Sequence, residues 1–254
     1  MLKTVLLDES LQKTFWNHVN QDPIDYHFFI FDLKNRLGET KIWLALEGEK
    51  VEGLLLVYRD HVVQLRGSRE AVKALLERVE LKEFELQAPL DCEDLVLAKY
   101  KPKVRQEMVL MALRRGEERI QITTQPVRIG ENDADEIAVL LNNADREWWG
   151  EVTAEQLRAR MGETINIGIK QDGRLVSVGI ARLTGYASNI STIATDERYK
   201  NRGYATSIVC ALVREILEAS EVAMIHVIKD NAPAVRAYAK AGFKPYETYL
   251  SIRT

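Results

Sequence analysis

The residues best suited to chemistry lie in two short segments of the C-terminal half. The first covers residues 196–206 and reads Asp-Glu-Arg-Tyr-Lys-Asn-Arg-Gly-Tyr-Ala-Thr. Gly203 has no Cβ atom, so a ligand can approach its backbone closely, and Lys200 and Arg202 add positive charge. If a helix starts here, its first turn presents unpaired N–H groups to an anion such as phosphate.

Periodicity predicts that helix and the strands around it. Apolar residues recur after Gly203 at the helical spacing i, i+3, i+4, i+7 and i+11, namely at Ala205, Ile208, Val209, Leu212 and Ile216. An apolar strand is expected before the turn, at residues 190–195, and another after the helix, at 222–228. An ordinary strand-to-helix turn also carries short glycine patterns, so this segment alone leaves both interpretations open.

The second segment, residues 231–243, has the pattern Asn-x-x-Ala-x-x-x-Tyr-x-Lys-x-Gly-Phe. Asn231 stands where a helix N-cap would stand, Pro233 falls in the first turn and Gly242 ends the helix. Ala234, Ala237, Tyr238 and Ala241 mark one face of this helix.

The two segments, in this order and at this separation, resemble the GNAT superfamily of acyl-CoA-dependent N-acyltransferases. Within it, the sequence is most similar to the glycine N-acyltransferase-like group, over roughly residues 127–254. The resemblance implies acetyl-CoA as co-substrate and no metal. One departure is Lys200, which stands where the family usually has Arg or Gln; the charge is kept but the planar guanidinium fork is lost.

The resemblance also implies which residues hold the coenzyme. The pantetheine arm would hydrogen-bond to the strand backbone as though it were an added strand, and the backbone N–H groups of residues 202–206 would hold the pyrophosphate. Tyr238 would be the catalytic proton donor, since a phenol with a pKa near 10 can supply a proton to a departing thiolate with a pKa of about 8.5. Alternatively, Tyr238 packs or hydrogen-bonds the coenzyme without transferring a proton. The expected coenzyme-binding residues are Ile193, Ala194, Thr195, Lys200, Asn201, Arg202, Gly203, Tyr204, Ala205, Thr206, Asn231, Ala234 and Tyr238.

A proton acceptor for the amine is harder to find. Several family members have a glutamate fourteen residues before the motif glycine, but this chain has Asn189 there, and an amide accepts no proton at neutral pH. Glu147, Glu151, His226 or a water chain could replace it. Without a strong base, less basic amines are favoured: an α-amino group with a pKa near 7.7–8.0 is substantially neutral at about pH 7, whereas a lysine amine near 10.4 is not.

The expected acceptor-binding residues are Glu147, Trp148, Trp149 and Asn189. In the family, the connection that contains the first three borders the acceptor pocket. Adjacent tryptophans near carboxylates could receive a cationic amine. Alternatively, one tryptophan packs in the core and the other covers a seam.

The predicted fold class is α/β, an α+β mixed sheet built as tandem GNAT-like domains of which the C-terminal one is complete. Both halves show the order helix, helix, hairpin, strand, helix, strand. We therefore expect a degenerate GNAT-like domain at 1–116, a linker at 117–126 that is partly strand, and an N-acetyltransferase domain at 127–254. In the first half Arg66-Gly67-Ser68 occupies the place of the phosphate turn, either as a second nucleotide site or as part of a packing domain.

Composition excludes several other classes of protein. The 35 basic and 38 acidic side chains are interspersed, so the sequence shows no basic cluster of the kind that binds nucleic acid. Cys92 and Cys210 form neither a disulfide framework nor a metal-ligand pair, so we expect a reducing, cytoplasmic setting. No apolar run approaches the roughly 18 residues of a membrane span. We expect a monomer or homodimer.

The sequence therefore predicts an acyl-CoA-dependent N-acyltransferase that acetylates a primary amine of a small molecule by direct attack in a ternary complex. Two alternatives stay open. One is a protein or peptide N-acetyltransferase, in which the amine belongs to a polypeptide. The other is a non-catalytic acyl-CoA-binding sensor, which the substitution at Asn189 would favour and the presence of Tyr238 would not.

Overall fold

The computed structural model describes residues 2–144 and 150–254. The chain divides into two compact units. Unit 1 contains residues 1–110, 228–230 and 246–254, and unit 2 contains residues 111–227 and 231–245. The last residues of the chain therefore belong to unit 1, although the sequence analysis assigned all of 127–254 to one domain. The reason is strand pairing, since residues 249–253 pair antiparallel with residues 85–89 of unit 1.

Unit 1 contains a mixed sheet in the strand order β1-β2-β3-β4-β5-β12. Only β4 and β5 pair in parallel among the neighbours β1 to β5 and β12. The elements are β1 (Lys3–Leu6), α1 (Gln12–Val19), α2 (His27–Asn35), β2 (Thr40–Glu47), β3 (Lys50–Tyr58), β4 (Val62–Gly67), α3 (Arg69–Leu76), β5 (Glu85–Pro89), α4 (Glu93–Lys99) and β12 (Lys244–Arg253). Strand β6 (Val104–Arg114) contributes residues to both units.

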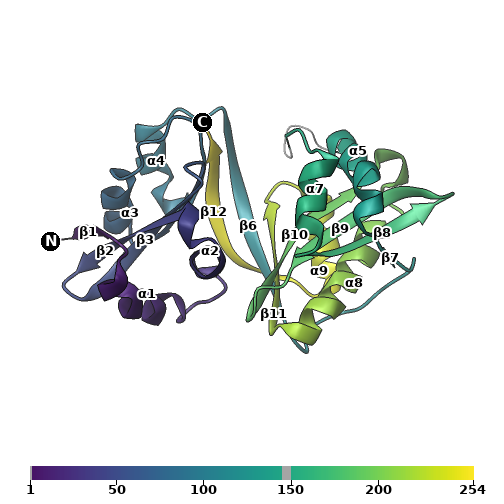
Figure 1. Cartoon of the computed structure of the whole chain (residues 1–254), viewed down its shortest axis with the longest axis horizontal. Coiled ribbons are helices and arrows are strands. Elements are labelled where there is room, and N and C mark those ends of the chain that lie inside the picture. The colour runs from purple at the N-terminus through teal and green to yellow at the C-terminus, as the bar shows by residue number, and fades with distance from the viewer. Residues whose placement is uncertain (1, 145–149) are drawn as a thin grey trace. The chain divides into compact units, whose positions relative to one another are not determined.

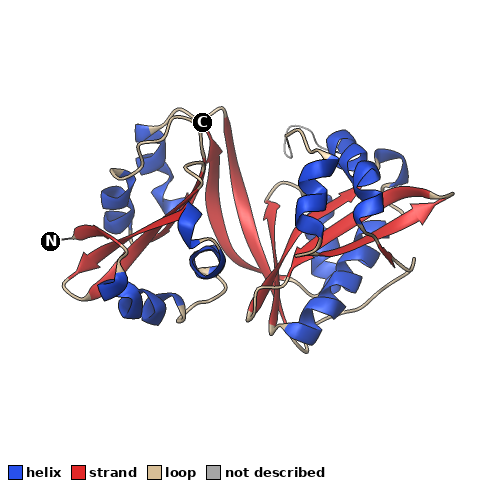
Figure 2. Cartoon of the chain, in the orientation of Figure 1, coloured by secondary structure: helices blue, strands red, loops and turns tan. Residues whose placement is uncertain are grey.

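Alternation along the strands gives unit 1 a core on each face of its sheet. On β3, Leu54 and Leu56 pack with residues of α1 and α2 such as Phe15 and Phe29. The intervening Leu55 and Val57 pack with residues of α3 and α4. The helices therefore cover both faces (Figure 2).

Unit 2 repeats this plan with longer elements around the predicted site (Figure 1). Its strand order is β11-β10-β9-β8-β7, in which only β10 and β11 pair in parallel. The elements are β7 (Val127–Arg128), α5 (Ala134–Ala144), α7 (Ala154–Met161), β8 (Ile165–Gln171), β9 (Arg174–Arg182), β10 (Ala187–Thr195), α8 (Tyr204–Ala219), β11 (Val222–Ile228) and α9 (Ala232–Ala241).

The two faces of this second sheet carry different helices. Val178 and Ile180 of β9 belong to the core that α5 and α7 cover. Gly179, between them, faces the other way, and a Cβ atom there would overlap Ile208 and Leu212 of α8. Helix α8 can lie so close to the strand only because position 179 has no side chain.

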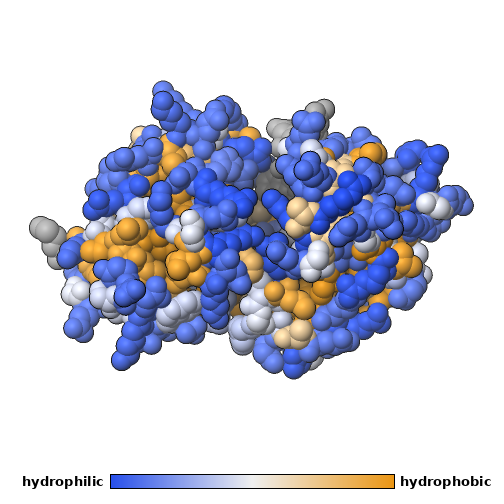
Figure 3. Space-filling view, viewed as in Figure 1, coloured by the Kyte–Doolittle hydropathy of each residue, from blue (hydrophilic) through white to orange (hydrophobic). Residues whose placement is uncertain are grey.

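The predicted α/β class with a mixed sheet in both halves is confirmed. The sequence analysis missed β1, α4, β7 and β12. The predicted strand character of the linker is wrong, because residues 117–126 form no strand; their backbone donates hydrogen bonds to helix residues instead. Hydrophilic side chains cover most of the visible surface of each unit, with hydrophobic ones between them (Figure 3).

Candidate functional site

Strand β10 changes its pairing at the predicted pantetheine stretch. Its parallel ladder with β11 runs from Ala187↔Val222 to Ile190↔Ile225. A register shift between Ile190 and Thr192 marks a bulge, and bulges bend and twist a strand away from its neighbour. Residues 193–195 pair with β9 only. On the side that faces β11, the backbone of residues 193–195 is therefore not part of the described ladder between β10 and β11.

A buried serine holds this part of β10 from the β9 side. The Ser177 hydroxyl donates to Ala194 O over 3.1 Å and lies 2.8 Å from Thr195 Oγ1. Ser177 is fully buried, so it acts as an internal anchor. The sequence analysis did not single it out, because a serine within an apolar strand pattern gives no signal of its partners.

The turn after β10 ends in a left-handed residue that leaves the helix start uncapped. Asp196 accepts from the backbone N–H of Arg198, and residues 197–199 form a short 3-10 helix. Asn201 and Gly203 have φ values of 63° and 82°. Gly203 is the N-cap of α8 and offers no side-chain hydrogen bond. The first N–H groups of α8, from Tyr204 to Thr206, therefore receive no side-chain cap.

Positive charge surrounds this helix start. Lys200 and Arg202 are exposed. Lys200 forms an ion pair with Glu197, and Arg202 donates to Arg198 O over 3.3 Å and lies over the Tyr199 ring. These are weak surface contacts that a stronger anion can replace. The turn thus combines an uncapped helix N-terminus, a glycine and two exposed cations, which suits a phosphate group.

The predicted linker forms one wall of this turn. Thr123 N and Thr124 N donate to the buried Ser207 Oγ over 3.1 and 3.3 Å. Thr123 Oγ1 would lie 3.2 Å from a Cβ atom at position 203. Further along, Gln121 N donates to Cys210 Sγ over 3.4 Å. Ser207 and Cys210 thus position the segment beside α8, a role that sequence periodicity did not reveal.

Helix α9 is built as the second motif predicted. Asn231 Oδ1 accepts from Ala234 N over 3.2 Å, so this side chain is the N-cap. Gly242 ends the helix at φ 112°, and a Cβ atom there would lie 2.6 Å from Glu117 O. Asn231 and Ala234 were both predicted to contact the coenzyme. Their hydrogen bond gives them a structural role at the start of α9, and the coenzyme contact stays a prediction.

Tyr238 lies on the buried side of α9. Its side chain is 6% exposed, and its ring lies 6.2 Å from that of Phe243. Burial raises the pKa of the Tyr238 phenol to about 12, because an ionised phenolate would lose its hydration. The Tyr238 hydroxyl therefore keeps its proton up to a higher pH than an exposed tyrosine does.

On the α5 and α7 face, Asn189 has a buried Oδ1 atom that accepts no hydrogen bond from the residues described. Its antiparallel partner on β9 is Arg182, and its parallel partner on β11 is Met224. His226, half-buried, follows Met224 by two residues and belongs to the same face.

The connection between α5 and α7 contains the other predicted acceptor residues. Glu147, Trp148 and Trp149 lie outside the described residues, and Glu151 is exposed. Asn142 fixes the end of that connection through two hydrogen bonds with the backbone of Val152, of 2.9 and 3.0 Å.

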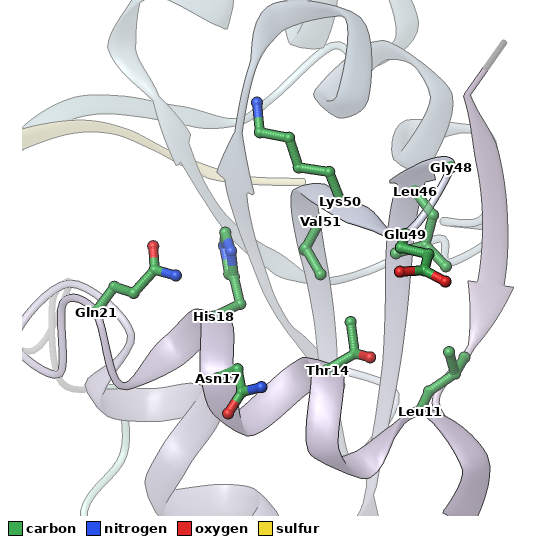
Figure 4. Close-up of a pocket in the computed structure, with 10 residues that line it drawn as sticks. All are labelled: Leu11, Thr14, Asn17, His18, Gln21, Leu46, Gly48, Glu49, Lys50 and Val51. Carbon is green, nitrogen blue, oxygen red and sulfur yellow. The ribbon is translucent and has the colours of Figure 1, made fainter.

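Unit 1 contains a separate cavity of about 680 Å³ between α1 and the turn that joins β2 to β3 (Figure 4). His18, Glu49 and Lys50 are among its lining residues. His18 Nε2 lies 2.9 Å from Tyr26 Oη, and burial lowers the pKa of the imidazole. None of the predicted site residues lines this cavity.

Neither metal nor membrane signals accompany the site. In residues 2–144 and 150–254, no group of three or more His, Cys, Asp or Glu side chains could hold a metal ion. No helix in the same ranges is long and apolar enough to cross a bilayer.

Comparison with known proteins agrees with this geometry. Residues 166–252 match the family of FR47-like proteins, a range that contains β10, the turn, α8 and α9. No curated protein matches. This likeness covers only part of the C-terminal half, and the finer likeness to glycine N-acyltransferases stays a prediction.

Solved structures extend the likeness to the whole chain. A Drosophila melanogaster protein is 12% identical over 99% of this chain and 97% of its own, with a TM-score of 0.72. A tandem GNAT protein from the clavulanic acid biosynthesis pathway is 14% identical over 100% and 98%, with a TM-score of 0.63. A GCN5-related N-acetyltransferase from Sphaerobacter thermophilus is 12% identical over 100% and 95%, with a TM-score of 0.66. The chain thus shares the fold of the tandem GNAT protein over its full length.

Proposed function

We propose that this chain is an acyl-CoA-dependent N-acyltransferase that transfers an acetyl group from acetyl-CoA to a primary amine of a small molecule. The observation that supports this most is the junction of β10 and α8. A strand edge released from β11 leads into a helix whose first N–H groups are uncapped and flanked by Lys200 and Arg202. An extended arm that ends in a pyrophosphate fits both features.

The buried phenol supports the chemistry. In the reaction the amine nitrogen forms a C–N bond to the acetyl carbon while the C–S bond breaks. The sulfur leaves as a thiol with the proton of Tyr238, the amine loses one proton to water, and Tyr238 regains its proton from solvent. Burial keeps the Tyr238 phenol protonated, so its proton is present when the thiolate departs. A phenol of raised pKa is also the weaker acid, so it gives up this proton only as negative charge builds on the sulfur.

The cysteines support direct attack rather than an acetyl-cysteine intermediate. Cys92 and Cys210 are both buried. Burial raises the pKa of the Cys92 thiol to about 12 and that of Cys210 above its ordinary range. A nucleophile must be a thiolate, so neither residue is suited to that role, and the amine must meet the acetyl group in one ternary complex.

Two other functions would use the same turn. A protein or peptide amine could take the place of the small molecule. A non-catalytic acyl-CoA sensor would bind the coenzyme without turnover, and Asn189 in place of a carboxylate favours it. The buried, protonated Tyr238 favours the enzyme, because a sensor has no use for a proton donor there.

The test is the release of coenzyme A thiol from acetyl-CoA in the presence of free amino acids, polyamines and short peptides. We expect amine-dependent release that falls by about 10²-fold in kcat in Tyr238→Phe, with an unchanged Kd for acetyl-CoA. Tyr186→Phe, at an exposed tyrosine of unit 2, is the matched control. Tight binding without release for any amine would indicate the sensor, and absence of binding would overturn the assignment of the turn.

A further inference from the structure

The predicted linker is fixed along helix α8 by two fully buried side chains, Ser207 and Cys210. Gln121 N donates to Cys210 Sγ over 3.4 Å, and Thr123 N donates to Ser207 Oγ over 3.1 Å. The two anchors are three residues apart on the helix, so they lie on one side of it, about 5–6 Å from each other. At its other end, the backbone N–H of residue 119 donates to the last residue of α9 over 2.8 Å. The linker therefore connects the end of α9 with the start of α8.

The hydroxyl groups of Ser207 and Thr123 lie 3.2 Å apart, and the neighbouring hydrogen bonds decide which of them donates. Ser207 Oγ already accepts from Thr123 N and from Thr124 N, over 3.1 and 3.3 Å. A hydroxyl has two lone pairs and one proton, so Ser207 Oγ has no lone pair left for a third donor. Its own proton therefore goes to Thr123 Oγ1. The proton of the Thr123 hydroxyl is then left for another acceptor.

The Thr123 hydroxyl lies beside the turn that precedes α8. Its Oγ1 atom would be 3.2 Å from a Cβ atom at position 203, and Gly203 is the N-cap of α8. Thr123 is exposed, and among the residues described its hydroxyl contacts only Ser207 Oγ. An O–H group with no acceptor of its own, next to the uncapped N–H groups of the helix, is a further donor for the same anion.

From this arrangement, and on the basis of the function proposed above, we infer that Thr123 of the linker belongs to the coenzyme site. Its hydroxyl donates to the pyrophosphate of acetyl-CoA, and Ser207 is the positioning residue that holds it there. Lys200 offers the phosphate a charge but no planar fork of donors. The linker hydroxyl adds a directed hydrogen bond without adding charge, so the segment that joins the two halves of the sequence also contributes to binding.

The experiment compares the binding of three acetyl donors to Thr123→Val by calorimetry. Acetyl-CoA and acetyl-dephospho-CoA both contain the pyrophosphate, whereas S-acetylpantetheine ends before it. For the first two donors we expect the Kd to rise about tenfold, because a hydrogen bond to a charged group is lost. For S-acetylpantetheine the Kd should stay within about twofold of that of the unmodified protein. A merely structural role of Thr123 would weaken the binding of all three donors.

Two further variants assign the effect to the hydroxyl group itself. Thr123→Ser keeps the O–H group, so the Kd for acetyl-CoA should stay within about twofold of that of the unmodified protein. Thr124→Val makes the same substitution at the next residue, whose described hydrogen bond to Ser207 comes from the backbone. It should leave the Kd of all three donors unchanged.

Ser207→Ala tests the positioning role. It removes both the acceptor of Thr123 N and the donor to Thr123 Oγ1, so the Kd for acetyl-CoA should rise about fivefold, with no rise for S-acetylpantetheine. The matched control is Ser188→Ala, because Ser188 is another fully buried serine of unit 2 that accepts from a backbone N–H, that of Thr184, over 3.0 Å. It should lower the melting temperature to a similar extent and leave the Kd unchanged.

The outcomes separate the role of the linker from the function itself. An unchanged Kd for acetyl-CoA in Thr123→Val, or an equal rise for S-acetylpantetheine, overturns the contact and leaves the turn before α8 as the coenzyme site. Loss of binding in Thr123→Ser does the same. Equal rises in Ser207→Ala and Ser188→Ala overturn the positioning role, since lost stability would explain both. Absence of acetyl-CoA binding to the unmodified protein overturns the proposed function, and the contact with it.

Discussion

The junctions of β4 with α3 and of β10 with α8 occupy the same place in the two units but are built differently. In unit 1 only Ser68 separates the strand from the helix, and its Oγ accepts from Ala71 N over 3.3 Å. In unit 2 residues 196–203 intervene, and the helix begins at Gly203 without a side-chain cap. One unit caps its helix start with a side chain, and the other leaves it without a side-chain cap.

The basic residues differ in the same way. Arg66 is 2% exposed, and it donates to Asp25 Oδ1 over 2.6 Å and to Gln87 Oε1 over 2.7 Å. Its guanidinium also lies 3.9 Å from the centre of the Tyr249 ring. Lys200 and Arg202 are exposed. A cation whose donors are used inside the protein cannot bind a ligand, so the comparison favours a packing role for the turn in unit 1.

The largest expected effect is that of Gly67→Ala on stability. Gly67 has a φ of 122°, and a Cβ atom there would overlap Glu52 O and Gly53 Cα, which are backbone atoms. We expect a loss of about 3 kcal/mol or more in the free energy of unfolding. Urea denaturation measures this loss. Gly48→Ala, also at positive φ but in open space, should cost only about 1–2 kcal/mol. Equal losses in the two variants would contradict the packing argument.

Gly203→Ala should weaken coenzyme binding and should also lower the free energy of unfolding by about 1–2 kcal/mol, the usual cost of a side chain at positive φ. The φ of 82° disfavours any side chain, but the nearest obstacle is the end of an exposed threonine, 3.2 Å away. We expect the Kd for acetyl-CoA to rise about tenfold. The reason is that the helix start must move out of its binding geometry or pay roughly 1–2 kcal/mol of conformational energy to keep it. Calorimetry measures the Kd. Gly185→Ala, at φ 89° with open space around it, should leave the Kd unchanged; an increase there too would show that the effect is not specific to the turn.

Ser207→Ala tests how strongly the linker is held on α8. It removes the acceptor of two backbone N–H groups, those of Thr123 and Thr124. We expect a loss of about 2 kcal/mol in the free energy of unfolding. Ser68→Ala, which removes one capping bond in unit 1, should cost about 1 kcal/mol. The prediction is wrong if Ser68→Ala is the more costly of the two.

The smallest effect is expected from pH. The pKa of Tyr238 is raised to about 12 by burial, so the donor form persists below that pH and is lost as pH rises through it. A phenol of ordinary pKa near 10 would cause kcat to fall between about pH 9 and 10.5. We expect no such fall with a saturating amine, in a kcat profile measured over this range. A fall near pH 10 that disappears in Tyr238→Phe would show that the pKa is not raised.

Local patterns determined much of this protein. Helical periodicity predicted α8, the N-cap and terminal glycine predicted α9, and the alternation of strands and helices predicted a mixed α/β fold repeated in two halves. These predictions rest on residues that are neighbours in sequence, and local propensity and apolar spacing encode such relations. Both motifs therefore appear in the structure where the sequence placed them.

Only the tertiary structure decided which distant residues meet. It placed the final strand β12 in unit 1, joined the linker to Ser207, and set Asn189 opposite Arg182. Each depends on strand register or on a hydrogen bond between residues far apart in sequence, and a shift of one residue would turn every side chain of a strand to the other face. The sequence by itself determined the turn before α8, because one glycine and one helix start suffice to build it. Residues of separate strands, such as Asn189 and Arg182, are brought together only by the packing of the sheet.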